Sequence, residues 1–174
     1  LSGAQVSRSR VWLFYATTAI YWASLYVYVP ILSPYARDKG ANLSIIGLVI
    51  ASYGLAQLLL RIPTGIWSDR VGRRKPFILI GFVAALISSL GMALSPDPWS
   101  LLFFRWVSGI AATTWVAFTV LFSSYFPPDK TTHAMSLITF CTSFGQLVST
   151  FSGGFLAESY GREFTFYVGV ALAI

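Results

Sequence analysis

The chain has 174 residues, of which 56% are hydrophobic and only 10% are charged. This composition excludes an ordinary soluble domain and is typical of a protein that lies largely within a membrane. The net charge of +6 lies in short segments between apolar runs, which argues against nucleic-acid binding. The sequence contains no metal-ligand cluster, nucleotide-binding loop or nucleophile–base pair, so we expect no cofactor, no bound metal and no enzyme activity.

Six apolar runs follow one another along the chain, and polar or proline-containing segments separate them. A helix of about 20 residues crosses the hydrocarbon core of a bilayer. The sequence therefore predicts an all-α, multi-pass membrane protein with a basic leader at 7–10. The predicted spans are 11–32, 43–62, 77–94, 99–122, 135–157 and a sixth that starts at 164 and is expected to be incomplete at 174.

The basic residues predict how the chain crosses the membrane. If the N-terminus is cytoplasmic, eight of the 12 Lys and Arg residues fall on the inner side and three on the outer side. Cytoplasmic connections carry an excess of Lys and Arg, so we expect a cell membrane protein with a cytoplasmic N-terminus. The inner set is Arg8, Arg10, Arg61, Arg70, Arg73, Arg74, Lys75 and Lys130, and the outer set is Arg37, Lys39 and Arg162.

The stretch 65–75, between the second and third spans, carries the most specific pattern. It reads Gly-x-x-x-Asp-Arg-x-Gly-Arg-Arg-Lys. This pattern resembles the signature loop of the major facilitator superfamily of secondary transporters, with Trp67 where that family usually has Leu. The resemblance implies transport of a small solute by alternating access, with this loop as an inner latch between two halves of the transporter. The matching residues are Gly65, Asp69, Arg70, Gly72, Arg73, Arg74 and Lys75.

Four residues of this stretch carry local expectations. Gly72 is expected to adopt a positive φ after a helix end, and Pro76 to occupy the first turn of the third span. Gly65 is expected to let a neighbouring backbone approach closely. Asp69 is expected to pair with one of the arginines that follow it, or to accept hydrogen bonds from a helix N-terminus.

The chain partly repeats itself at an offset of 89 residues. Each copy contains three spans, so the second copy must be inverted in the membrane relative to the first. We therefore expect two inverted three-helix repeats, 1–94 and 95–174, and the resemblance implies the N-terminal half of a twelve-helix protein. The superimposed pairs are Gln57 and Gln146, Leu58 and Leu147, Gly65 and Gly154, Asp69 and Glu158, Gly72 and Gly161, Arg73 and Arg162, and Phe77 and Phe166.

Arg105 is the one charged residue that lies away from the ends of a predicted span, since Arg61 is the last residue but one of 43–62. A charge at membrane depth is costly, so Arg105 either faces a functional interior or extends to the outer headgroups. Its surroundings, with Ser108 and Gly109, resemble the fourth-helix motif of proton-coupled members, which leaves proton coupling open. Because no acid lies inside a span, a proton relay would need the other half or Glu158.

In this family helices one and four line the central cavity, which makes their polar and aromatic residues candidate contacts. The alternatives are packing or an interfacial belt for the aromatic residues, and interhelical hydrogen bonds for the two glutamines. The candidates for substrate or coupling contacts on these two helices are Arg105, Tyr21, Tyr28 and Trp115. Two further candidates, Gln57 and Gln146, lie in the second and fifth spans.

Glycines in the fourth and fifth spans are expected to let helices approach one another. The stretch 145–154 resembles a drug–proton antiporter pattern, but Ser149 and Thr150 replace its Gly-Pro pair, which puts an antiporter assignment in doubt. The predicted packing glycines are Gly109, Gly145, Gly153 and Gly154.

The expected partners are a small-molecule substrate, the lipid bilayer, and a C-terminal six-helix half of the protein. A second copy of the chain, forming a homodimer of natural halves, is an alternative to that second half. A receptor or scaffold that uses the same fold without transporting anything is a further alternative. No nucleic acid is expected.

Overall fold

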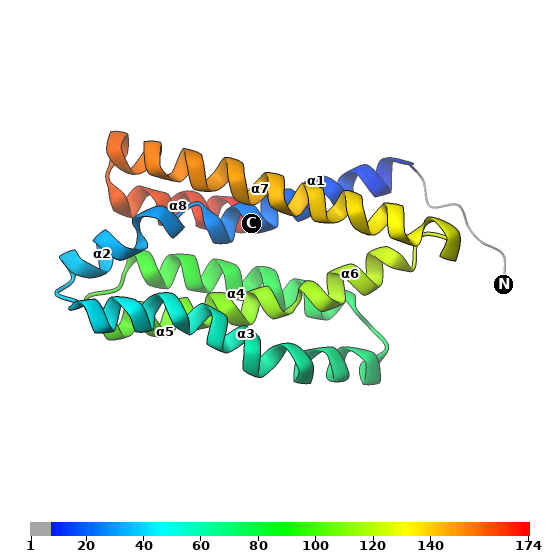
Figure 1. Ribbon diagram of the computed structural model, residues 1–174, viewed down its shortest axis with the longest axis horizontal. Coiled ribbons are helices and arrows are strands. Elements are labelled where there is room, and N and C mark those ends of the chain that lie inside the picture. The colour runs from blue at the N-terminus through cyan, green and yellow to red at the C-terminus, as the bar shows by residue number, and fades with distance from the viewer. Residues whose placement is uncertain (1–7) are drawn as a thin grey trace.

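The computed structural model describes residues 8–174, and these form a bundle of helices without any strand. The helices lie along the long axis of the molecule (Figure 1). Residues 1–7, with the first residue of the predicted basic leader, lie outside the described part. The elements are α1 (Arg8–Tyr26), η1 (Val29–Ile31), α2 (Leu32–Asp38), α3 (Leu43–Val71), α4 (Lys75–Ala93), α5 (Pro98–Thr113), α6 (Trp115–Ser123), η2 (Pro128–Lys130), α7 (Thr131–Tyr160) and α8 (Arg162–Ala173).

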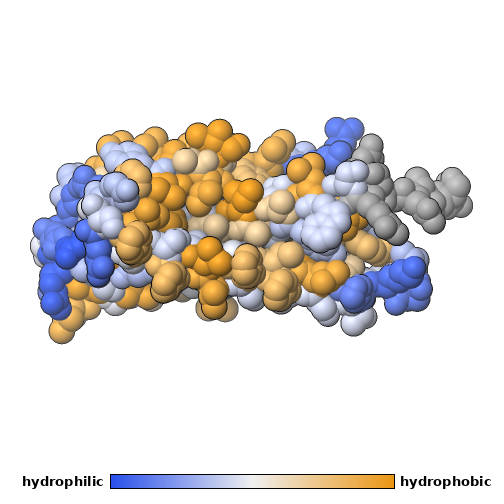
Figure 2. Space-filling model, turned by 90° about the horizontal axis from the view of Figure 1, so that it is seen from above, coloured by the Kyte–Doolittle hydropathy of each residue, from blue (hydrophilic) through white to orange (hydrophobic). Residues whose placement is uncertain are grey.

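The surface is that of a membrane-spanning bundle. Hydrophilic residues gather at the two ends, and a hydrophobic band lies between them (Figure 2). Within residues 8–174, four helices are long and apolar enough to cross a membrane: α3, α4, Pro98–Ser123 and α7. They correspond to the second to fifth predicted spans. The connections α2–α3, α4–α5 and α7–α8 lie at one end of the bundle, and α3–α4 and α6–α7 lie at the other (Figure 1).

The first predicted span was wrong in its extent. Its helix ends at Tyr26, and the chain continues through η1 and α2 to Asp38. Pro30 lies in the first turn of η1. Proline has no N–H to donate and its ring collides with the preceding helical turn, so one continuous helix over 11–32 is replaced by three shorter elements.

The second span extends further than predicted, and most of the signature stretch is helical. Helix α3 continues through Pro63 to Val71, so the connection to α4 consists of residues 72–74. Proline inside a membrane helix is tolerated because neighbouring groups satisfy the freed backbone, and α3 changes direction along its length (Figure 1). Gly72 ends the helix with φ +65°, and Pro76 lies in the first turn of α4, as predicted.

Gly72→Ala is expected to lower the free energy of unfolding by about 1 kcal/mol, because a Cβ disfavours a left-handed backbone. The site has open space, since a Cβ would meet nothing within 4 Å. Gly54→Ala is the matched control: its site is equally open, but its φ is not positive. Thermal unfolding of the purified protein should show a lower Tm for Gly72→Ala alone, and equal shifts would contradict the explanation.

Asp97 begins α5 as its N-cap. Its Oδ1 accepts hydrogen bonds from the backbone N–H of Ser100 at 3.0 Å and of Trp99 at 2.8 Å. These bonds favour the ionised carboxyl and hold the pKa of Asp97 below its usual value, the bond from Ser100 contributing most. The cap therefore stabilises α5 above the ordinary carboxyl pKa, and this contribution is lost as the pH falls.

The helix pairs have the symmetry that an inverted repeat requires. Helix α3 packs on α5 and α7 on α1, while α4 contacts α5 and α8, and α8 contacts α1. Exchanging α3 with α7, α5 with α1 and α4 with α8 leaves these pairs unchanged. Helix α3 shifted by 89 residues also coincides with α7 to within one residue at each end. The division into repeats 1–94 and 95–174 stays a prediction with this support.

Three of the predicted packing glycines lie where two helix backbones meet. A Cβ on Gly109 of α5 would lie 2.5 Å from the carbonyl oxygen of Tyr53 on α3. On α7, a Cβ on Gly145 would collide with the carbonyl oxygen of Ala19 on α1, and one on Gly153 with that of Val27, just after α1. These are the close contacts that small residues permit in membrane helix bundles.

Two glycines lack the close approach predicted for them. A Cβ on Gly154 would meet nothing within 4 Å, and one on Gly65 would make only an ordinary contact, 3.6 Å from Val116 Cγ1. The prediction from sequence was therefore wrong in placing Gly154 at a packed contact. Neighbouring positions on a helix point in directions about 100° apart, so Gly153 faces the backbone of Val27, just after α1, while Gly154 does not.

Candidate functional site

Arg105 lies in the interior of the bundle with 5% of its surface exposed. Its guanidinium carbon is 4.3 Å from the ring centroid of Tyr53 on α3 and 5.8 Å from that of Tyr28, which follows α1. Both distances are within the range of cation–π attraction. Of the two alternatives for Arg105, the structure has the interior placement and not extension to the headgroups.

No carboxylate pairs with Arg105 in the part of the chain that the structure describes. Its Nη1 donates a long hydrogen bond to Ser108 Oγ at 3.4 Å, and its Nε has no hydrogen-bond partner. A buried cation without a counter-charge is costly, and aromatic faces recover part of that cost. Among the side chains that the structure describes, the ion pairs join Lys39 to Glu163, Arg74 to Asp69 and Arg162 to Asp38.

Three other buried hydroxyls near Arg105, those of Tyr28, Tyr53 and Ser89, form no hydrogen bond of regular geometry. Their interactions are weak ones with neighbouring hydroxyls, between Tyr28 and Ser89 and between Tyr53 and Tyr26. Ser89 and Tyr28 lie side by side, because both would contact the same Cβ placed on Gly169. Buried polar groups are almost always hydrogen-bonded. This group, which we call the Arg105 cluster (Arg105, Tyr28, Tyr53 and Ser89), therefore has unused capacity to bind an anion or a hydrogen-bonding solute.

Tyr21 supports the break between α5 and α6. It is fully buried, and its hydroxyl donates to the carbonyl oxygen of Ala111 at 2.6 Å and lies 3.2 Å from Thr114 Oγ1. Thr114 separates the two helices and donates to the same carbonyl oxygen. A solute would have to replace these bonds, so the contact predicted for Tyr21 would require rearrangement.

The remaining candidates lie apart from the cluster or at its edge. Trp115 is half-buried, and its ring packs edge-on against Trp22 at 5.4 Å between centroids. Gln57 and Gln146 are half-buried on α3 and α7, and neither side chain forms a hydrogen bond within residues 8–174. Their roles as solute contacts stay predictions.

Sequence reasoning missed Tyr53, whose ring is the nearest to Arg105. The available signal was a tyrosine one helical turn before Gln57 in an otherwise apolar span, which places both on one face of α3. The sequence did not reveal the pairing partner. Gly109 lets α3 approach α5, and one turn before Gly109 along α5 the guanidinium of Arg105 meets the Tyr53 ring.

The signature stretch forms a basic surface at the end of the bundle opposite α2. Asp69 Oδ1 accepts a hydrogen bond from Arg74 Nη2 at 3.2 Å. Arg70, Arg73 and Lys75 are exposed, and none of them forms an ion pair with another described residue. Asp69 thus makes one of the pairings that the sequence predicted and leaves three cations of this surface open.

A family model described as Major Facilitator Superfamily matches residues 14–174. The chain is 32% identical over 149 residues to an "Uncharacterized transporter" of Buchnera aphidicola subsp. Schizaphis graminum, covering 84% of this chain and 37% of that protein. It is 28% identical over 167 residues to "Inner membrane transport protein YajR" of Escherichia coli, covering 95% of this chain and 36% of that protein.

One further relative by sequence and one solved structure are also similar to this chain. The chain is 28% identical over 148 residues to "Multi-drug resistance efflux pump PmrA" of Streptococcus pneumoniae, covering 83% of this chain and 37% of that protein. The fold resembles the crystal structure of a bacterial homolog of the human lysosomal transporter Spinster, in an inward-facing and unoccupied conformation, with a TM-score of 0.78. The two chains are 19% identical, and the match covers 95% of this chain and 41% of that one. The chain thus spans 36% to 37% of the curated relatives described here.

Proposed function

This chain belongs to the Major Facilitator Superfamily, and from that premise we propose that it is the N-terminal six-helix half of a secondary transporter that moves a small solute by alternating access. The observation that carries the proposal is Arg105, a buried cation without a counter-ion in the described chain. Charged residues inside membrane segments are rare and usually mark a substrate or ion pathway. In this proposal the Arg105 cluster contributes one side of the solute site.

The second half of the site comes from another six-helix unit. In the most apolar 18-residue stretch of each spanning helix, 22% of α3 and 28% of α7 is buried, against 50% of α4 and of Pro98–Ser123. Helices α3 and α7 therefore offer the surfaces against which a C-terminal half would pack. A second copy of this chain would fit the same surfaces, and native mass spectrometry of the full-length protein distinguishes the two by chain mass.

The test of transport uses the full-length protein reconstituted in liposomes. We expect uptake or efflux of at least one organic solute above the rate in empty liposomes, with the N-terminus on the cytoplasmic side of the cell membrane. Imposing a proton gradient tests coupling, since a coupled transporter would accumulate solute against its concentration gradient. Failure to move any solute from a broad panel of organic cations, anions and neutral compounds would favour the receptor or scaffold alternative.

Asp69→Asn is expected to reduce transport more than fivefold while membrane insertion stays normal. In the proposed latch, Asp69 holds the two halves together on the inner side in one conformation. Its exposed pair with Arg74 alone is worth at most about 1 kcal/mol, or roughly fivefold. Initial transport rates and the amount of inserted protein, measured on the same liposomes, provide the comparison.

Two controls separate the latch from the local ion pair. Arg74→Gln breaks the same pair but keeps the Asp69 carboxylate, so its effect should be smaller. Asp129→Asn removes an acid at the same end of the bundle outside the signature stretch and should leave transport unchanged. Equal rates for Asp69→Asn and Arg74→Gln would contradict the latch.

A further inference from the structure

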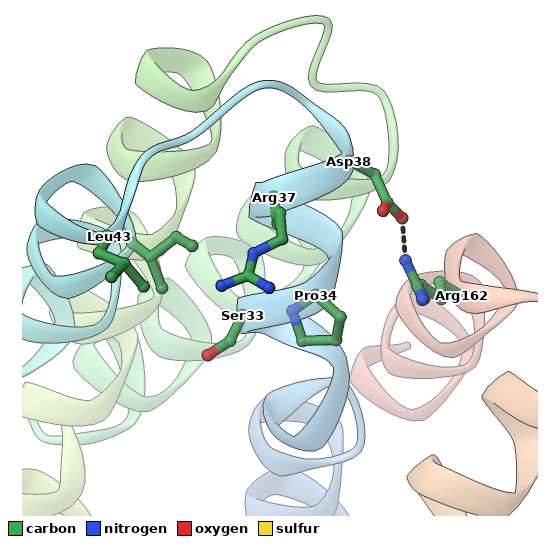
Figure 3. A pocket seen from close by; sticks show the side chains of 7 residues that line it. Ser33, Pro34, Arg37, Asp38, Leu43 and Arg162 are labelled. Atoms are coloured by element: carbon green, nitrogen blue, oxygen red, sulfur yellow. Dashed lines mark hydrogen bonds and ion pairs between the residues drawn. The ribbon is translucent and has the colours of Figure 1, made fainter.

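A cavity of about 490 Å³ opens at the end of the bundle where α2, α3 and α8 meet (Figure 3). It shares no residue with the Arg105 cluster, and the charge distribution predicts that this end faces the outside. Its size is within the range of small-molecule sites. Figure 3 shows Arg37 extending from α2 into the space beside Ser33 and Leu43, while Arg162 on the other side of Pro34 extends toward Asp38.

The charges around this cavity leave one cation without a partner. Asp38 is paired with Arg162, and Glu163 is paired with Lys39 at 3.7 Å. Arg37 is exposed, and its guanidinium forms no ion pair or hydrogen bond within residues 8–174. Because the neighbouring acids are already neutralised by other bases, the cavity keeps the positive charge of Arg37.

The wall that carries Arg37 is held in place from behind. Ser33 and Arg37 are one helical turn apart, so they lie on the same face of α2. Tyr35, on another face of α2, is buried, and its hydroxyl donates to the carbonyl oxygens of Ala93 at 3.2 Å and Met92 at 3.3 Å. A hydroxyl and a guanidinium are thus presented together by a helix that is fixed to α4.

The rest of the cavity is apolar. Leu43 and Ile46 come from the first turn of α3, and Pro34 lies between the two arginines. Guanidinium groups bind carboxylates and phosphates through two parallel hydrogen bonds. We propose that this cavity binds an amphiphilic anion, whose phosphate or carboxylate contacts Arg37 and Ser33 and whose apolar part lies against Pro34, Leu43 and Ile46.

The site is tested with octyl phosphate as the probe and the full-length protein in phosphatidylcholine nanodiscs. Isothermal calorimetry should show saturable binding of octyl phosphate. Arg37→Gln should weaken this binding tenfold or more, as expected for the loss of a charge-assisted contact. Ser33→Ala should weaken it by a few fold. Arg37 is exposed, so Arg37→Gln should fold normally, which its Tm will verify.

Two controls make the test specific. Arg61→Gln removes one exposed arginine elsewhere on α3 and should leave binding unchanged. Octanol, which has the same chain without the charge, should bind the wild type much more weakly. Equal affinity of octyl phosphate for wild type and Arg37→Gln, or equal affinity of octanol and octyl phosphate for the wild type, would overturn the proposal.

The same measurement identifies the source of the anion. If a membrane phospholipid is the occupant, nanodiscs containing phosphatidylglycerol should weaken octyl phosphate binding by competition, and Arg37→Gln should remove this difference. If a dissolved amphiphile is the occupant, the affinity should be the same in both kinds of nanodisc. Both results retain the site, and both require the loss of affinity in Arg37→Gln.

Discussion

Gly153→Val is expected to leave little folded protein, whereas Gly154→Val is expected to fold like the wild type. The two residues are neighbours on α7, so membrane insertion, helix propensity and hydrophobicity change equally in both variants. A Cβ at position 153 would collide with the backbone carbonyl oxygen of Val27, but at position 154 it would meet nothing within 4 Å. The Cβ is fixed to the backbone of α7, and the carbonyl oxygen belongs to the backbone of Val27. No side chain can therefore move to relieve the collision.

The expected cost at position 153 is at least about 3 kcal/mol, the upper part of the range for overpacked sites. The helix pair α1·α7 would have to separate, and Val27 lies just before η1, where the first helical segment is already interrupted. Fluorescence-detected size-exclusion chromatography and Tm measurements on both variants provide the test. Similar profiles for the two variants would mean that the α1·α7 contact is not as close as described.

Arg105→Met is expected to lower transport about 30-fold or more while the protein stays as stable as the wild type or becomes more stable. Replacing a buried charge by an apolar side chain of similar size is often neutral or stabilising by about 1–4 kcal/mol. Arg105 fits this case because it is buried and has no ion-pair partner among the described residues. If it binds the solute, removing it should lower the transport rate about 30-fold or more.

Stability and transport measured together decide between a functional and a structural role. A lower Tm for Arg105→Met, with loss of transport in proportion to loss of folded protein, would assign Arg105 to the fold. Arg105→Lys keeps the charge but loses the planar group that lies over Tyr53. Arg105→Lys should therefore be less stable than Arg105→Met but retain more transport. The two variants thus rank in opposite order for stability and for transport.

Sequence reasoning identified Arg105 and Tyr28 but missed Tyr53, the ring nearest to the charge. Hydropathy marks a charge inside an apolar run without any knowledge of the fold. The ring that contacts the charge comes from another helix, and its choice depends on where α3 and α5 touch. Gly109 sets that point of contact, so Tyr53 meets Arg105 while Gln57, one turn further along α3, remains half-buried without a hydrogen bond.

The two proline interruptions show the same limit. Pro30 lies near the end of the first predicted span, 11–32, and Pro63 follows directly on the second, 43–62. The chain breaks at Pro30 into η1 and α2, but α3 continues through Pro63 to Val71. Thr64 follows Pro63 directly, and its Oγ1 lies 3.4 Å from Thr113 Oγ1 of α5. The continued helix therefore gains contacts that a local rule for proline does not include.

By itself, the sequence determined the all-α membrane class, four of the spans, the turn at Gly72 and the family signature. These depend on composition, on the length of apolar runs and on backbone preferences of single residues, all of which are local. The tertiary structure decided which glycines are packed, which rings contact Arg105, and that Asp38 pairs with Arg162, 124 residues away. Those outcomes depend on the relative placement of helices, which each helix's own sequence does not contain.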